Sequence, residues 1–542
     1  MPALAAPACR PEPEARPPGA DWWRDAVIYQ IYPRSFLDGN GDGVGDLAGV
    51  AERLDYVAEL GVDAIWLSPF FVSPQADFGY DVADHCAVDP LFGTLADFDR
   101  VVERAHALGL KVLIDQVWSH TSTEHAWFAA SRAARHGPHA DWYVWADASA
   151  DGTPPNNWLS VFGGAAWTWD ARRRQYYLHH FLSAQPQLDL HRPEVRAALL
   201  ASGEFWLARG VDGFRLDAID FYLHDPLLRD NPPAALPEPP VKPFALQRHV
   251  HDMLHAGIAD FLREIRTLAD RFGAVTLGEI SSQDGANERV HRYTGGRDML
   301  HLAYTLRLCR ERFEPRAFRD AIEAATGAPR PGTVCWSLSN HDVERAISRW
   351  AGEHDPRVQR LLMALPLCLQ GATCLYQGEE LALTEARLAR HELRDPFGIA
   401  YYPVFRGRDG SRTPMPWDAT RPHAGFTTAA APWLPVCESH RPRAARQAAA
   451  DPGSLLHAYR RFLRWRRGAF GARDAMRLAD APDPLLAFWR GPVLCAFNFD
   501  AQPAELALPT GVAPLAGHGF ESSASGSRAR LPGFGAFFGR LA

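Results

Sequence analysis

The chain has 542 residues, of which 47% are hydrophobic and 22% charged, values typical of a soluble protein with large buried cores. Its net charge of −7 at pH 7 and its lack of a long basic run argue against a nucleic-acid partner. No stretch of about 18 apolar residues occurs, so no membrane-spanning helix is expected. The eight cysteines are scattered without a C-x-x-C pair, which favours reduced thiols. We expect a cytoplasmic enzyme that acts as a monomer or homodimer.

The first 21 residues are rich in proline, lack a basic start and a long apolar run, and are predicted to form a disordered leader. After them, β-branched or aromatic runs alternate with segments of helical periodicity. The runs predicted as strands are 27–33, 64–70, 111–117, 213–219, 275–280, 299–306, 334–342 and 372–378. Eight strands alternating with helices predict an α/β fold, a closed (β/α)8 TIM barrel. An open doubly wound sheet is disfavoured because no Gly-rich dinucleotide turn follows the first strand.

The alternation breaks after the third predicted strand, where residues 118–212 are rich in Trp, Gly, Asn and His. We expect an inserted subdomain there, with strands near 142–145 and 176–181. Two long loops, 225–243 and 381–435, are expected over the same face of the barrel. The predicted domains are the leader at 1–21, the barrel at 22–117 and 213–452, the inserted subdomain with its return helix at 118–212, and a linking helix with a C-terminal antiparallel β-sandwich at 453–542.

The segment DGNGDGVGD, residues 38–46, has the spacing of a calcium-binding loop, with Gly43 at the sixth position, where such loops turn sharply. Position 12 is Gly49, so the bidentate glutamate of a calcium sensor is missing. The spacing alone leaves open a metal site with another role and a Gly/Asp-rich turn without metal. The candidate ligands are Asp38, Asn40, Asp42, the carbonyl oxygen of Val44 and Asp46.

Three acids, Asp217, Glu279 and Asp342, stand at predicted strand ends, which share one face of a barrel. Two carboxyl groups can cleave a glycosidic bond together, one attacking the anomeric carbon and the other protonating the leaving oxygen. Arg215 lies two residues before Asp217 and therefore projects to the same side of its strand, where we expect it to keep Asp217 ionised. Apolar neighbours are expected to raise the pKa of Glu279.

From Trp22 onward the chain resembles the α-amylase superfamily, glycoside hydrolase family 13, and most closely its α-glucosidase and oligo-1,6-glucosidase branch. The motifs that carry this resemblance occur in the order of the family. They are FGYDV (78–82), VDPLFGT (88–94), DQVWSH (115–120), GFRLDAID (213–220), LGEI (277–280), SNHD (339–342) and GRDGSRTPMPW (407–417).

The resemblance implies a retaining, double-displacement mechanism, with Asp217 as the nucleophile, Glu279 as the acid/base and Asp342 as the transition-state stabiliser. It also implies a set of substrate-binding residues: Asp77, Tyr80, His120, Phe162, Phe181, Arg215, His341 and Arg412. Asp77 and Arg412 match residues that close the pocket around the non-reducing end, so an exo-acting enzyme is expected. In this branch the Asp/Asn loop holds one structural divalent cation, calcium or alternatively magnesium, and no organic cofactor is expected.

The chain departs from the family pattern at Ser119, which replaces an Asn, and at QPQLD (185–189), where no second ion is assigned. Ala218 follows the nucleophile; small residues there accompany α-1,4 specificity in this branch, and Val accompanies α-1,6 specificity. We therefore expect an α-glucosidase that prefers short maltose-like substrates and also transfers glucosyl groups to hydroxyl acceptors.

Two rival functions use the same three acids: an oligo-1,6-glucosidase and a sucrose-cleaving α-glucosidase. A non-catalytic sugar-binding relative is disfavoured, because it would have little reason to keep all three acids together with Arg215.

Overall fold

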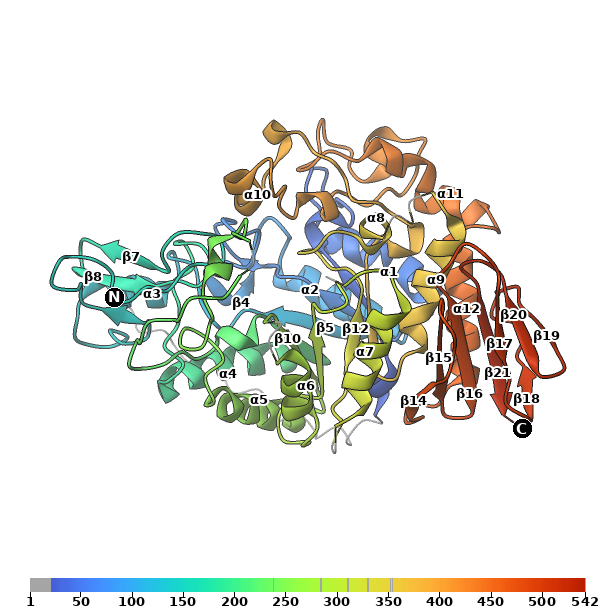
Figure 1. Ribbon diagram of the computed structural model, residues 1–542. Coiled ribbons are helices and arrows are strands. Elements are labelled where there is room, and N and C mark those ends of the chain that lie inside the picture. The colour runs from blue at the N-terminus through green and yellow to red at the C-terminus, as the bar shows by residue number, and fades with distance from the viewer. Residues whose placement is uncertain are drawn as a thin grey trace.

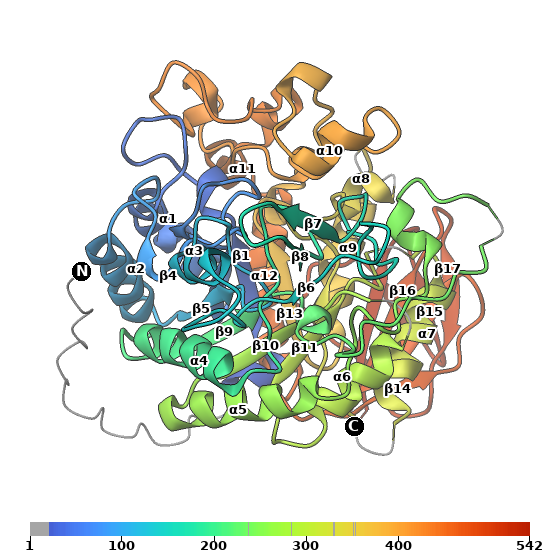
Figure 2. The same cartoon turned by 90° about the vertical axis from the view of Figure 1, so that its left-hand side faces the viewer.

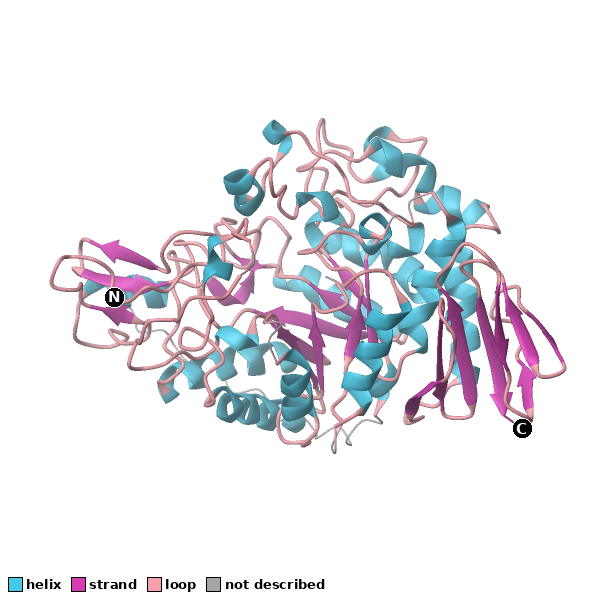
Figure 3. Cartoon of the chain, viewed as in Figure 1, coloured by secondary structure: helices cyan, strands magenta, loops and turns pink. Residues whose placement is uncertain are grey.

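The computed structural model describes residues 21–541 except 237, 283–284, 310, 329–330, 351 and 353. Apart from Asp21, the predicted leader lies outside the described residues. Strands gather in three places along the molecule: a small sheet at one end, a central barrel, and paired sheets at the C-terminal end (Figure 3). Within the described residues, no helix has the length and apolar character needed to cross a membrane.

The centre of the molecule is a parallel eight-stranded barrel, which confirms the predicted fold class (Figure 1). The neighbours in the sheet run β11-β10-β9-β5-β2-β1-β13-β12, and a parallel bridge between Ala303 and Val334 joins its two ends. The strands are β1 (Val27–Ile31), β2 (Ala64–Leu67), β5 (Lys111–Gln116), β9 (Gly213–Leu216), β10 (Val275–Ile280), β11 (Leu302–Thr305), β12 (Cys335–Ser337) and β13 (Ala372–Tyr376). All eight overlap the predicted strands.

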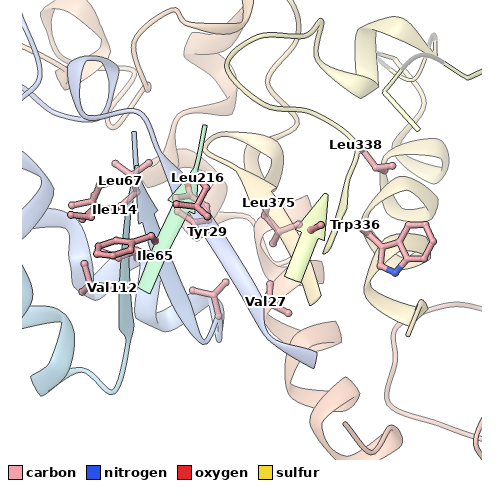
Figure 4. Packing of buried hydrophobic residues seen from close by; sticks show 14 of the residues in the cluster. Val27, Tyr29, Ile65, Leu67, Val112, Ile114, Leu216, Trp336, Leu338 and Leu375 are labelled. Carbon is pink, nitrogen blue, oxygen red and sulfur yellow. The ribbon is translucent and has the colours of Figure 1, made fainter. Parts of the chain in front are cut away.

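Side chains of each barrel strand divide between two cores, as the period of two requires. Tyr29 and Ile65 pack outward against the helices, in the cluster shown in Figure 4. Their neighbours Ile28 and Trp66 point into the barrel, where they join a separate interior cluster with Leu113. Both faces of the strands are therefore buried, which explains why they read as continuous apolar runs.

Helices surround the barrel (Figure 2). They are α1 (Leu47–Leu60), α2 (Leu95–Ala107), α4 (Pro193–Leu207), α5 (Ile258–Phe272), α6 (Ala286–Thr294), α7 (Pro315–Thr326), α8 (Ala346–Arg349), α9 (Pro356–Cys368) and α12 (Leu455–Ala469). Local sequence explains their ends: Asp46 caps α1 by accepting from Gly49 N at 2.7 Å, and Gly61, with φ of 90°, ends it. Thr94 and Asp97 form a capping box at α2.

The insertion after β5 contains α3 (Ala126–Ala133) and a three-stranded antiparallel sheet of β6 (Trp145–Ala146), β8 (Gln175–Leu178) and β7 (Trp167–Asp170). Strands β6 and β8 overlap the two predicted strands, but β7 was not predicted. A further short pair, β3 (Phe71–Val72) and β4 (Asp84–Val88), follows β2.

The C-terminal segment forms two antiparallel sheets, β14-β15-β16-β21-β18 and β17-β20-β19, with an apolar cluster drawn from both. This agrees with the predicted β-sandwich, and the sheets lie at the opposite end of the molecule from β7 and β8 (Figure 1). Their strands are β14 (Met476–Ala479), β15 (Leu485–Arg490), β16 (Val493–Asn498), β17 (Ala504–Ala507), β18 (Val512–Pro514), β19 (Ser523–Ser525), β20 (Arg528–Leu531) and β21 (Ala536–Leu541).

Between β13 and α12 runs a long segment with short helices, α10 (Pro396–Tyr401) and α11 (Ala445–Ala450). The predicted loop at 225–243 has no regular structure in its described residues before the 3₁₀ helix η4 (Pro243–Leu246).

Candidate active site

The three predicted acids meet at the carboxyl-terminal ends of the barrel strands. Asp217 follows β9, Glu279 lies near the end of β10, and Asp342 follows β12. All three line one cavity of about 1170 Å³. Of the eight residues expected to bind substrate, five line the same cavity: Asp77, Tyr80, His120, Phe162 and Phe181.

 The other three, Arg215, His341 and Arg412, are fully buried and contact acids that line the cavity.

Arg215 connects the acids at the floor of the cavity. Its Nη1 donates to Asp217 Oδ1 at 2.6 Å and to Asp115 Oδ1 at 2.8 Å, and its Nη2 donates to Glu279 Oε2. Tyr304 OH lies 2.7 Å from the same Nη2. Arg215 and Asp217 are two residues apart, so their side chains project to the same face and meet, as expected.

Burial and Arg215 act in opposite directions on the two central carboxyl groups. Burial raises the pKa of Glu279 to about 7, against the attraction of Arg215. That agrees with the expectation from its apolar neighbours. Burial also raises the pKa of Asp217 to about 7, although Arg215 lowers it. Arg215 thus favours the ionised form of Asp217, as expected, but desolvation outweighs this effect and leaves the pKa above its usual value.

Asp342 has the opposite electrostatic character. Burial would raise its pKa, but His341, Arg408 and Arg412 outweigh burial and hold the pKa of Asp342 well below its usual range. Arg412 Nη2 donates to Asp342 Oδ1 at 2.7 Å, and Arg408 Nη1 lies 3.3 Å from the same oxygen. Asp342 is therefore ionised beside Asp217 and Glu279, the two carboxyl groups whose pKa values are raised.

Asp77 and Arg412, the two residues expected to close the pocket, do not pair with each other. Asp77 pairs with Arg408, whose Nη2 donates to Asp77 Oδ1 at 2.6 Å, and both residues line the cavity. Arg412 donates to Asp342 and to the backbone oxygen of His341. Both arginines belong to the motif at 407–417, and sequence spacing could not decide between them. Gln185 also reaches Asp77, at 3.2 Å, and was not predicted.

Tyr80 and His341 form a stacked pair, with ring centroids 5.3 Å apart and an interplanar angle of 4°. Gln30 Nε2 lies 2.7 Å from His341 Nδ1, His341 Nε2 lies 2.6 Å from Tyr80 OH, and Tyr80 OH donates to Asp115 Oδ2 at 3.0 Å. Burial lowers the pKa of His341 to about 3, so the imidazole is neutral. This chain of hydrogen bonds holds Tyr80 in place where it lines the cavity.

His120 is held by the residue that departs from the family pattern. Ser119 Oγ lies 2.7 Å from His120 Nδ1, and His120 Nε2 lies 3.0 Å from the backbone oxygen of Tyr80. The small hydroxyl therefore supports the imidazole directly. Phe181 packs 5.2 Å from the His120 ring and 6.3 Å from Phe162, which continues the cavity wall.

Ala218, the residue after Asp217, has a left-handed backbone with φ of 42° and ψ of 48°. Non-glycine residues adopt this conformation at a cost, which surrounding structure must maintain. Here its backbone N–H donates to Glu279 Oε2 at 3.2 Å. The strained turn thus links the segment after β9 to the acid on β10.

The loop at 38–46 offers oxygen donors, but its carboxylates also organise the loop itself. Asp38 accepts from Gly41 N at 2.6 Å and Gly43 N at 2.8 Å, and Asp46 accepts from Asn40 N at 3.0 Å. Within the described residues, no three His, Cys, Asp or Glu side chains are gathered as a metal site. Asp38 Oδ2 accepts from both Gly43 N and Thr427 Oγ1, and Asp46 Oδ2 accepts from both Gly39 N and Asn40 N, so these two oxygens are already engaged. The loop still offers only oxygen donors, the ligand type that calcium prefers.

The barrel and its cluster of acids define a glycoside hydrolase, and comparison with known proteins identifies its family. The α-amylase catalytic-domain model matches residues 30–471, so the chain belongs to the α-amylase family. A probable α-glucosidase of Rhizobium meliloti (strain 1021) is 50% identical over 97% of this chain and 98% of its own length. An oligo-1,6-glucosidase of Heyndrickxia coagulans is 36% identical over 82% of this chain and 85% of its own length. The crystal structure of an α-glucosyl transfer enzyme, XgtA, superposes with a TM-score of 0.93 at 49% identity, covering 97% of this chain and all of that one.

Proposed function

We propose that the chain is a retaining, exo-acting α-glucosidase that releases α-glucose from short α-glucosides and also transfers glucosyl groups to hydroxyl acceptors. The observation that carries this proposal is the bridging of Asp217 and Glu279 by one guanidinium at the floor of the cavity. Such close carboxyl groups suit a nucleophile and an acid acting directly on the sugar, without the intervening water of an inverting enzyme.

In the first step Glu279 gives its proton to the glycosidic oxygen while Asp217 Oδ attacks the anomeric carbon, and the leaving alcohol departs. The raised pKa of Glu279 keeps that proton available near neutral pH. In the second step a water or another hydroxyl gives its proton to Glu279 and displaces Asp217. Asp342, ionised throughout, stabilises the positive charge that develops on the sugar ring.

The pair of Asp77 and Arg408 lines the cavity, where it could close the pocket around the non-reducing glucose unit, and this supports exo action. Both groups are buried and hydrogen-bonded, so they are suited to hold hydroxyls of the non-reducing glucose unit. Ala218 supports a preference for α-1,4 linkages, as a small side chain at this position of the cavity.

We also propose one structural divalent cation, calcium or alternatively magnesium, at Asp38, Asn40, Asp42, the carbonyl of Val44 and Asp46. The oxygen-only donor set supports this assignment. A cytoplasmic monomer or homodimer is proposed as well. The seven cysteines of the described residues are all free thiols, which is consistent with a reducing compartment.

The deciding experiment follows maltose, isomaltose and sucrose separately by proton NMR. Rapid release of α-glucose from maltose, with isomaltose slower, is the expected result. Initial formation of β-glucose would exclude retention. Faster turnover of isomaltose or sucrose would leave the barrel and its acids unchanged but overturn the linkage assignment.

A further inference from the structure

The cavity is much larger than its glucose site requires. Its volume of about 1170 Å³ exceeds the roughly 300–1,000 Å³ typical of pockets for small-molecule ligands. The acids and the Asp77–Arg408 pair occupy one end. The remaining part, beyond Ala218, is where a leaving group or an acceptor must lie, so its lining decides which acceptors bind.

An apolar cluster forms one wall of this outer part. Its members are Ala218, Phe221 and Met253, with Val161, Phe181, Phe244 and Leu254 packed against them, and every one of them lines the cavity. Phe244 is held in place by His249, with ring centroids 3.5 Å apart and an interplanar angle of 13°. Hydroxyls buried against such a wall would lose hydrogen bonds to water, whereas an aromatic ring gains from the contact.

Further aromatic residues line the cavity. Phe397 and Phe405 lie 4.9 Å apart, and Lys242 Nζ sits 4.3 Å and 3.8 Å from their ring centroids. Phe397 in turn packs 4.8 Å from Phe162, which lies 6.3 Å from Phe181 of the apolar cluster. These rings therefore extend the apolar lining of the cavity.

The exposed mouth of the cavity is positively charged, although the whole chain has a net charge of −7. Arg248, Arg387 and Arg406 line the cavity, are exposed, and form no ion pair within the described residues. Of the acids that line the cavity, Asp77, Asp217, Glu279 and Asp342 already pair with Arg215, Arg408 or Arg412. The other two are Glu344, which is exposed, and Glu385, whose pKa burial raises to about 7. The arginines therefore outnumber the carboxylates that could neutralise them, and an anion at the mouth would be attracted.

We propose that the outer part of the cavity is an acceptor subsite for aromatic hydroxy acids, with the ring against the apolar lining and the carboxylate at the arginines. This inference rests on the proposed function. The acceptor hydroxyl attacks the anomeric carbon of the glucosyl-enzyme, its proton passes to Glu279, and the bond to Asp217 breaks. An α-glucoside of the aromatic acid forms, and Asp217 leaves as a carboxylate.

The test supplies maltose as the donor and compares three acceptors at equal concentration: 4-(hydroxymethyl)benzoate, benzyl alcohol and xylose. Glucosides are quantified by chromatography, and glucose release without acceptor tests the proposed function separately. We expect about tenfold more benzyl alcohol glucoside than xylose product, and a further severalfold advantage for the benzoate that declines in 0.5 M salt. Xylose glucosylated as well as benzyl alcohol would overturn the subsite.

Two variants locate the effect. Phe244→Gln should reduce the advantage of both aromatic acceptors over xylose, and Arg406→Gln should reduce only the advantage of the benzoate over benzyl alcohol. Product ratios within one variant do not depend on how much of it folds. Arg316→Gln, an exposed arginine on α7 away from the cavity, is the matched control and should keep all ratios. Unchanged ratios in Phe244→Gln would contradict the apolar wall, and equal yields from the two aromatic acceptors would contradict the charged mouth.

Discussion

At the scale of single residues, the candidate site is governed by the competition between burial and one guanidinium. Asp217 and Glu279 both touch Arg215, yet burial raises the pKa of each to about 7. Asp342 pairs with Arg408 and Arg412, and its pKa moves the other way. Three carboxyl groups in one cavity thus divide into two with raised pKa values and one that stays ionised.

The role of Glu279 is tested by Glu279→Gln, which removes the proton donor but keeps the size of the side chain. Turnover of maltose should fall about 10²- to 10⁴-fold, the usual contribution of a general acid. An aryl α-glucoside with an acidic leaving group needs no such proton, so its first step should fall far less. Steady-state and burst kinetics on both substrates measure this. Equal losses on the two substrates would argue against a general acid.

The raised pKa values also predict how activity depends on pH. As pH rises through about 7, Glu279 loses the proton that the leaving oxygen needs, so kcat/KM for maltose should decline. At low pH Asp217 gains a proton and ceases to be a nucleophile, so activity should decline there too. A pH profile of kcat/KM should therefore be bell-shaped. Full activity maintained well above pH 8 would contradict the raised pKa of Glu279.

At the scale of elements, the cavity depends on long loops that meet above the barrel. The segment after β9 brings Lys242 onto Phe397 and Phe405 of the segment after β13. The insertion contributes Phe162 to the same group of rings. These segments limit the space open to long substrates.

Loss of the Lys242 charge should weaken the cation–π contact of this residue with Phe397 and Phe405. Cation–π contacts contribute about 0.5–2 kcal/mol, so Lys242→Met should raise the kcat/KM ratio of maltotetraose to maltose severalfold. Lys242→Arg retains the cation and serves as the control. An unchanged ratio in Lys242→Met would show that this contact does not restrict chain length.

The loop at 38–46 is tied to the same long segment. Asp38 N donates to Phe426 O at 3.1 Å, Trp433 N donates to Gly43 O at 2.9 Å, and Thr427 Oγ1 donates to Asp38. A cation held there would stabilise this junction rather than take part in the reaction.

Treatment with EDTA should therefore lower the melting temperature and leave kcat at moderate temperature nearly unchanged. An ion present at 100 times its Kd contributes about 2.7 kcal/mol. Adding calcium or magnesium back would identify the preferred ion by which one restores the melting temperature. No metal in elemental analysis, together with an unchanged melting temperature, would refute the metal site.

At the scale of the whole molecule, a buried ion pair joins the C-terminal sheets to the base of the barrel. Asp25, just before β1, accepts from Arg466 Nη2 of α12 at 2.6 Å and from Arg490 of β15. Arg466 Nε also donates to Leu367 O at 2.6 Å, and Arg490 Nη1 donates to Leu369 O at 2.8 Å. Both arginines are buried, so they depend on this carboxylate for charge balance.

Asp25→Asn should destabilise the molecule by about 3–5 kcal/mol, the cost of leaving buried charges uncompensated. Asp21→Asn, which removes a more exposed carboxylate nearby, is the control and should have a much smaller effect. Urea denaturation measures both variants. The folded Asp25→Asn enzyme should keep its kcat for maltose, since the change lies at the end of the barrel opposite the cavity. Equal stability of the two variants would contradict the structural role of Asp25.

The sequence by itself determined the barrel, its strands and the three acids that meet in one cavity. Strand runs are visible because both faces of each strand are buried, and strand ends share a face because parallel strands run in one direction. Arg215 and Asp217 could be paired from their spacing alone, since side chains alternate along a strand.

Only the tertiary structure decided which arginine closes the cavity, how burial shifts the carboxyl groups, and what lines the acceptor side. Arg408 and Arg412 occupy the same motif, and their partners depend on where the whole segment lies against Asp77 and Asp342. Phe244 and Lys242 come from an irregular loop, where no periodicity marks the side chains that face inward. Desolvation likewise depends on everything packed around a carboxyl group, and contacts between segments far apart in the chain are what provide it.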